Sequence, residues 1–292
     1  MLEPIIPADP IADLVDVLDL KQLPDGNYLG RTQWMPQGRV FGGQVLAQSL
    51  IAAMKSVDPD RPVHSLHSYF LRAGDIGKEI AFEVENLRDG KSFSARRVKA
   101  LQDGKPIFVL SCSFQQPSAG VEHQESMPAN LPDPLSLPSA SDLLSKIDHP
   151  ATNYWSKARP FDLRHVTEPV YLRPAKDQVA EQMIWFKAIS PLPTDIATQT
   201  AALAYASDYT ILESILKKHN LSWAHPGLNT ASLDHALWFH AEPNVNDWML
   251  YVQHSPTAQS GRGLAFGSIY ARDGKLLASV AQEGMVRVPE FR

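Results

Sequence analysis

The chain has 292 residues, a length that predicts two domains at about 150 residues each. Lysine and arginine number 27 against 32 aspartate and glutamate residues, so the net charge is -5; the basic surplus that nucleic-acid binding requires is absent, which excludes that role. Hydrophobic residues make up 44% and allow a buried core, while a single cysteine, Cys112, rules out an internal disulfide and a cysteine zinc cluster.

The first half of the chain opens with helical patterns and continues with strand patterns. Behind Asp9, which is suited to cap a helix, apolar residues at helical spacing predict a short amphipathic helix. A second helix is expected over 42–54, after a Gly-Gly start. Alternating patterns predict strands over 63–71, 80–87, 93–101 and 107–114. The last two are joined through Asp103-Gly104, which is a strong hairpin signal.

A proline-rich segment separates the two halves. Six prolines lie between positions 117 and 150, among many serine and aspartate residues, a composition typical of a linker. We therefore expect an N-terminal domain over 1–118, a linker over 119–158 and a C-terminal domain over 159–292.

The second half repeats the order of the first. Strands are expected over 161–166 and 183–189, then a helix over 194–217, then strands over 231–239, 248–254, 264–271 and 276–288. Asp273-Gly274-Lys275 follows Asp103-Gly104-Lys105 by 170 positions, and each is preceded by a histidine-bearing strand. This recurrence indicates a divergent duplication. The expected fold class is α+β, with one long helix wrapped by an antiparallel sheet in each half.

Asp208 lies on the apolar stripe of the helix expected over 194–217. A carboxylate on such a face requires a hydrogen-bonding or ionic partner, or a role in catalysis or binding, because its desolvation costs several kcal/mol unless it is paired. Two interpretations are open at this stage: Asp208 serves chemistry, or it caps a second helical segment that begins near Tyr209.

Two further polar residues are expected to face the same helix. Gln282 shares its strand face with Leu276, Ala278 and Val280 by the two-residue period, and Ser232 begins a strand of the same half. A buried serine bonded to backbone and a glutamine at a strand end are the alternatives for these two residues.

Several ungapped blocks together resemble the type II acyl-CoA thioesterases, the TesB-like double-hotdog family. The resemblance extends from about residue 12 to residue 287 and is weakest in the proline-rich segment. The blocks are Arg39-Val40-Phe41-Gly42-Gly43-Gln44-Val45, 64–72, 87–98, Tyr205-Ala206-Ser207-Asp208, 233–240 and Gln282-Glu283-Gly284. One departure is Ala73, where relatives often have proline.

The resemblance implies two fused hotdog folds and a catalytic trio that activates water without a covalent acyl-enzyme. The matching positions are Asp208, Ser232 and Gln282, the residues that the patterns place on inward faces. No metal and no cofactor are implied. Because no acid occurs between Asp25 and Asp58, the helix of the first half lacks a carboxylate, and one active site per chain is expected.

Four residues are candidates for substrate binding. Gly42 and Gly43 start a helix, where free backbone N–H groups favour negative charge; Gly43 is expected to donate to the thioester oxygen, and close helix packing is the alternative reading of the pair. Arg96 and Arg97 point to opposite faces of their strand, and one of them is a candidate contact for a CoA phosphate. The alternative is that they lie at a solvated sheet edge and bind no ligand.

A cysteine and two histidines are the other reactive side chains considered for catalysis. Cys112 on a strand is expected to be a small buried hydrophobe rather than a nucleophile. His64 and His67 point to opposite strand faces, and catalysis by His64 is the alternative mechanism within the enzyme hypothesis.

The sequence thus predicts a thioesterase that hydrolyses fatty acyl-CoA to free acid and CoA. A hotdog-fold hydratase or dehydratase that uses histidine, and a non-catalytic acyl-CoA-binding protein, are the alternatives. We expect a homodimer or homotetramer. An acidic beginning without an export signal, and no apolar run of membrane length, predict a cytoplasmic protein without membrane contact.

Overall fold

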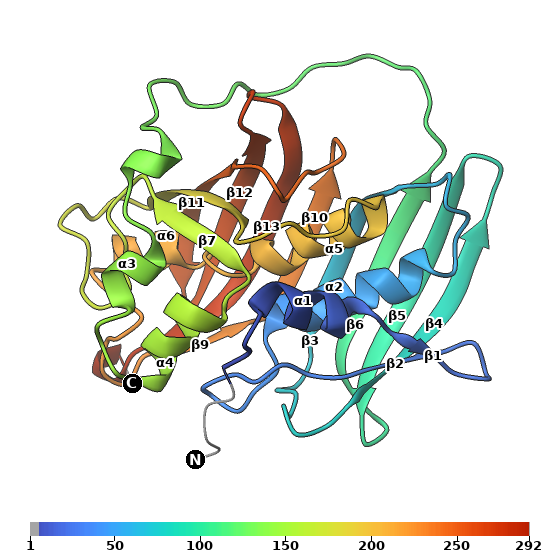
Figure 1. Cartoon of the computed structure of the whole chain (residues 1–292), viewed down its shortest axis with the longest axis horizontal. Coiled ribbons are helices and arrows are strands. Elements are labelled where there is room, and N and C mark those ends of the chain that lie inside the picture. The colour runs from blue at the N-terminus through green and yellow to red at the C-terminus, as the bar shows by residue number, and fades with distance from the viewer. Residues whose placement is uncertain (1–5, 292) are drawn as a thin grey trace.

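The strands form one antiparallel sheet that runs through both halves of the chain, of which the computed structural model describes residues 6–291 (Figure 1). The first half contributes β1 (Lys21–Gln22), β2 (Tyr28–Gly30), β3 (Val63–Phe70), β4 (Ile80–Asp89), β5 (Phe93–Gln102) and β6 (Lys105–Gln115). The second half contributes β7 (Phe161–His165), β8 (Glu181–Ala188), β9 (Asn229–Ser232), β10 (Asp234–Phe239), β11 (Met249–Gln259), β12 (Arg262–Ala271) and β13 (Leu276–Arg287).

The strand order is a mirror image about the middle of the sheet. It reads β1-β2-β4-β5-β6-β3 in one half and β10-β13-β12-β11-β8-β7 in the other, with β9 paired to β13 outside this path. The two halves join where β3 and β10 pair antiparallel, with Leu66 opposite Leu237. Both leucines are fully buried, so the joint lies in the hydrophobic interior of the molecule.

Helices cover one face of this sheet. They are α1 (Pro10–Leu18), α2 (Gly42–Met54), α3 (Ala140–Leu144), α4 (Pro150–Asn153), α5 (Ile196–Ser207) and α6 (Glu213–Lys218), with single turns η1 (Pro134–Ser136), η2 (Tyr154–Ala158, π-helical) and η3 (Pro289–Phe291). Helices α2 and α5, one from each half, pack against each other (Figure 1). The main hydrophobic cluster contains residues from both helices and from the strands behind them.

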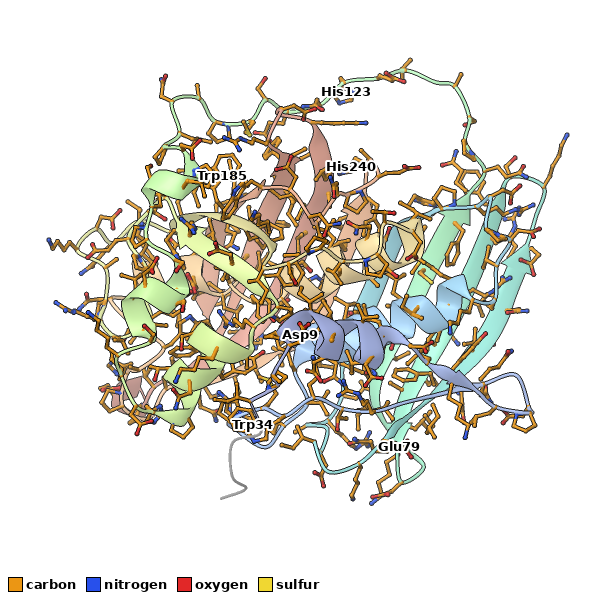
Figure 2. The ribbon with its side chains drawn as sticks, viewed as in Figure 1. Asp9, Trp34, Glu79, His123, Trp185 and His240 are labelled. Atoms are coloured by element: carbon orange, nitrogen blue, oxygen red, sulfur yellow. The ribbon has the colours of Figure 1, made fainter. Side chains whose placement is uncertain are left out.

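The first helices and the hairpin turn confirm the sequence predictions. Asp9 caps α1 by accepting from the N–H groups of Ile11 and Ala12 (Figure 2), and α2 has the predicted bounds. Asp103 and Gly104 both have positive φ, 50° and 70°, as the two-residue turn between β5 and β6 requires. Apart from the strand predicted over 231–239, the predicted strands are present with ends shifted by a few residues, and the short β1 and β2 were not predicted.

The segment expected as a linker has two parts. Residues 116–133 contain no helix or strand and pass over the top of the sheet in the view of Figure 1. The part that follows folds into η1, α3, α4 and η2, in which Leu144, Tyr154 and Ala158 are buried. Proline and serine therefore start short helices here, as the Ser139 capping box of α3 shows.

The single helix predicted over 194–217 is wrong, because the chain leaves the helix after Ser207. The Ser207 carbonyl accepts a hydrogen bond from the Tyr251 hydroxyl at 3.0 Å, and the next amides make tighter turns, with Tyr209 N–H bonded to Ala206. Two helices, α5 and α6, result. Asp208 is the residue that follows α5, where a side chain can turn away from the helix axis.

The strand predicted over 231–239 is also interrupted. The Asp234 carboxylate accepts the Glu283 N–H at 2.8 Å and replaces a main-chain partner at this point of the ladder. β9 therefore pairs with β13, while β10 continues between β13 and β3. Ser232 ends β9 rather than beginning a strand, and it lies at the break.

Candidate active site

Asp208 lies where the end of α5 meets the beginning of α2. A Cβ atom added to Gly42 would come within 2.5 Å of Asp208 Oδ2, so only glycine fits beside the carboxylate. One added to Gly43 would meet the Tyr205 carbonyl oxygen at 2.2 Å. The glycine pair is thus required for close packing, and it brings the positive end of α2 to Asp208.

The three predicted catalytic residues form one hydrogen-bonded chain. Ser232 Oγ donates to Asp208 Oδ1 at 3.0 Å, and Gln282 Nε2 donates to Ser232 Oγ at 3.0 Å. Asp208 and Ser232 are partly exposed, whereas Gln282 is fully buried. The alternative that Asp208 caps the next helix is wrong, because that helix, α6, has no side-chain cap.

A fourth residue, His235, completes this chain and was missed by the sequence analysis. Its Nδ1 atom bonds to Gln282 Oε1, and its Nε2 atom lies 3.0 Å from Ser207 Oγ. The ring is fully buried. The repeat contained a signal for this residue. The sequence analysis matched the histidine-bearing strands of the two halves as evidence of duplication but assigned no role to His235.

Burial and hydrogen bonding act in opposite directions on the charge of Asp208. Burial raises the pKa of this carboxyl, and His235, Gln282, Ser232 and the Gly43 N–H favour its charged form but leave the pKa above its usual range. Burial also lowers the pKa of His235. The imidazole is therefore favoured as a neutral ring that donates from Nδ1 to Gln282, which turns the amide so that Nε2 faces Ser232.

The remaining candidates occupy other places. Arg96 is only 2% exposed and its guanidinium is bound by Asp89, by the hydroxyl and carbonyl of Ser56 and by other backbone oxygens, which removes it as a phosphate contact. Arg97 is exposed and pairs with Glu85 at 3.5 Å. Among metal-ligand residue types within 6–291, no group is suited to hold a metal ion.

Two other reactive side chains lie outside the Asp208 group. Cys112 is buried as expected, and burial raises the pKa of its thiol to about 12. His64 Nε2 lies 2.9 Å from Ser113 Oγ, and its ring packs edge-on against Phe93, so its polar contact is with the first-half sheet.

The chain matches family models over both halves. Residues 159–285 match the model described as acyl-CoA thioesterase, and residues 31–115 match the acyl-CoA thioesterase N-terminal domain. The chain therefore belongs to the acyl-CoA thioesterase family, in its TesB-like type II branch, and is a thioester hydrolase.

Individual relatives agree with this assignment. The chain is 37% identical to acyl-CoA thioesterase 2 of Haemophilus influenzae, over 97% of this chain and all of that protein. Its sequence is 40% identical to that of the acyl-CoA thioesterase II TesB2 from Mycobacterium marinum. The two structures match with a TM-score of 0.79 over 96% of this chain and all of that one. A protein of Alicyclobacillus acidocaldarius described as having a hot dog fold shares the fold at 20% identity, with a TM-score of 0.76, over 95% and 98% of the two chains.

No helix within the described part of the chain is long and apolar enough to cross a membrane.

Proposed function

We propose that the chain hydrolyses fatty acyl-CoA to free fatty acid and CoA, with water activated by Asp208, Ser232 and Gln282. The observation that carries this proposal is the direction of the hydrogen bonds. From His235 through Gln282 and Ser232, each group donates toward the Asp208 carboxylate, and a carboxylate at the end of such a chain is suited to accept a proton from water.

The reaction follows from these positions. A water molecule bound beside Asp208 gives a proton to the carboxylate while its oxygen attacks the thioester carbon. The new C–O bond forms, the C–S bond breaks, and the proton held by Asp208 passes to the departing CoA sulfur. Gly43 N–H faces the Asp208 carboxylate and is freed as Asp208 takes up the proton; it is our candidate to stabilise the negative charge that then develops on the carbonyl oxygen, since it lies at the positive end of α2.

Ser232, Gln282 and His235 have different tasks in this scheme. Ser232 and Gln282 orient the water and the carboxylate, so each contributes less than the base. His235 acts through Gln282 as a positioning residue, because its Nδ1 bond fixes which end of the amide faces Ser232.

The mirrored strand order supports two fused hotdog folds that arose by duplication. β1, β2, α2, β3, β4, β5 and β6 have counterparts in the same chain order in β7, β8, α5, β10, β11, β12 and β13. The residue that follows α2 is Lys55, whereas the residue that follows α5 is Asp208. We therefore retain the prediction of one active site per chain, with domains at 1–118 and 159–292.

Substrate contacts, assembly and location extend the proposal. Arg97 remains the candidate for a CoA phosphate, because it is exposed while Arg96 is engaged inside the protein. A homodimer or homotetramer and a cytoplasmic location remain predictions from the sequence.

Release of free CoA thiol from a panel of acyl-CoAs by the purified chain tests this function. Acid and thiol should appear in equal amounts without added metal. A 2-enoyl product from a 3-hydroxyacyl-CoA would instead support the dehydratase alternative, and binding without thiol release would support the carrier alternative.

A further inference from the structure

The hydroxyl group of Tyr251 bonds to the main chain directly before Asp208. It donates to the Ser207 carbonyl at 3.0 Å, an oxygen that in a continuing helix would accept from the N–H of the fourth residue further on. Tyr251 is 2% exposed and Ser207 is fully buried, so water does not compete for this bond. Because the Ser207 carbonyl and the Asp208 N–H belong to one planar peptide group, a bond that fixes the carbonyl also constrains where the Asp208 side chain begins.

The side chain of Ser207 is held as well. Its Oγ atom lies 3.0 Å from His235 Nε2, and His235 bonds in turn to Gln282. Ser207 is thus bonded to β11 through its carbonyl and to β10 through its hydroxyl group. Since buried polar groups in folded proteins are nearly always bonded, the residue before the carboxylate is held in one orientation by two strands.

The Tyr251 ring has a fixed place in the sheet. β11 lies between β8 and β12, with Tyr251 opposite Ile184 on one side and Ile269 on the other. A Cβ atom added to Gly267 of β12 would come within 2.3 Å of the ring atom Cε2 of Tyr251, so the ring lies directly against the glycine main chain. A ring seated in this way on an inner strand provides the rigid support that a catalytic group requires.

The first half of the chain, whose helix α2 carries no carboxylate, offers an internal comparison. β4 and β11 occupy matching places in the mirrored strand order. The third residue of β4 is Phe82, which is fully buried, and the third residue of β11 is Tyr251. At the end of α2 the Met54 carbonyl accepts from the main chain, from the Val57 N–H at 3.2 Å. The half that carries the carboxylate therefore has a hydroxyl group where the other half has none.

The surroundings of Tyr251 exclude a role in proton transfer. Burial raises the pKa of its phenol well above the ordinary value, and the nearby charge of Asp208 raises it further. The hydroxyl group therefore keeps its proton near neutral pH, and what it contributes is the bond to Ser207.

We propose that Tyr251 is a positioning residue for the hydrolysis: its hydroxyl group, through the Ser207 carbonyl, holds the Asp208 carboxylate toward the amino end of α2. This inference rests on the proposed function, in which Asp208 is the base. Tyr251 acts only through the main chain of Ser207.

Tyr251→Phe in the full chain tests this role, because it removes the hydroxyl group and keeps the ring. A misplacement of about 1 Å can cost about a hundredfold in rate, and we expect kcat for acyl-CoA hydrolysis to fall about tenfold or more with little change in KM. Tyr270→Phe is the matched control. Tyr270 is equally buried on the adjacent strand β12, but it packs with Trp185 and Trp248, and its variant should keep the wild-type kcat.

The pH dependence of kcat distinguishes positioning from a general loss of stability. A carboxylate that turns away from Ser232 and the Gly43 N–H loses hydrogen bonds that favour its charged form. The pKa of Asp208 should therefore rise, and the fall in kcat on the acid side should move to higher pH in Tyr251→Phe. His235 on β10, the other titratable side chain that acts on this charge, is unchanged in the variant. A loss of kcat without the shift overturns the positioning role.

A second variant reaches the same contact and serves if Tyr251→Phe does not fold. Gly267→Ala keeps the Tyr251 hydroxyl group, but the added methyl group displaces the ring that carries it. We expect the same fall in kcat and the same shift to higher pH.

Asp208→Asn, alone and combined with Tyr251→Phe, separates this inference from the proposed function. If Tyr251 acts through Asp208, its substitution should have no further effect on kcat in the Asp208→Asn chain, and an equal loss in both backgrounds overturns the positioning role. An unchanged kcat in Tyr251→Phe beside a loss in Asp208→Asn overturns this role and leaves the proposed function standing. A wild-type kcat in Asp208→Asn overturns the role of Asp208 as base and, with it, that of Tyr251.

Discussion

Asp208→Asn tests the role of the carboxylate while keeping its shape. The asparagine oxygen can still accept from Ser232, so the hydrogen-bonded chain and substrate binding should persist. The amide cannot take a proton from water, and loss of a general base lowers rates by about 10² to 10⁴-fold, which corresponds to roughly 2.7 to 5.4 kcal/mol in the barrier. We expect kcat to fall in this range with little change in KM.

Thiol release under saturating acyl-CoA measures this effect, and Asp195→Asn is the matched control. Asp195 caps the other end of α5 through the Thr198 N–H, and asparagine caps equally well, so this variant should keep wild-type activity. If Asp208→Asn retains more than about a tenth of the wild-type kcat, the activation barrier has risen by less than roughly 1.4 kcal/mol. Such a result would show that Asp208 is not the base.

Three more predictions concern the same site and its assembly. Ser232→Ala and Gln282→Ala should each lower kcat by less than Asp208→Asn, since each removes one orienting bond; a larger loss in either would move the base elsewhere. Because burial raises the pKa of Asp208 and activity needs its charged form, kcat should fall with decreasing pH at a higher pH than for an exposed aspartate, whose pKa is about 3.9. Ala204→Ser, which adds a hydroxyl group on the last turn of α5, four positions before Asp208, should move this fall in kcat to lower pH; a fall that keeps its pH in this variant but disappears in His64→Ala would assign the titration to histidine. Light scattering at micromolar concentration should show a dimer or larger species, and a monomer alone would refute the predicted assembly.

The sequence was informative about the site where periodicity places a polar residue among apolar ones. Asp208 and Gln282 interrupt apolar stripes, and in the structure both contact Ser232. His235 also interrupts an apolar stripe, that of Leu233, Leu237 and Phe239, but its role depends on a cross-strand neighbour, since β10 and β13 pair with Ala236 opposite Ala281. Pairing between strands far apart in the chain is not encoded in local pattern.

Other features were missed because tertiary contacts decide them. The end of α5 depends on the Tyr251 hydroxyl, which belongs to a strand more than forty positions away in the chain. The burial of Arg96 depends on Ser56 and Asp89, whereas alternation along its own strand shows only that it faces away from Arg97. Helix propensity and strand alternation thus predict where the elements lie. Contacts with distant parts of the chain determine where the elements end and whether their charged side chains are buried.

The junction of β3 and β10 has a consequence for behaviour on dilution. The glycines that face Asp208 come from the first half of the chain, and the carboxylate comes from the second, so the proposed reaction centre spans both. In an assembly of separate single-fold chains, this centre would be lost as the subunits dissociate. Here the covalent connection fixes the effective concentration of one half about the other, so activity per molecule should stay constant as the protein is diluted, even where larger assemblies fall apart.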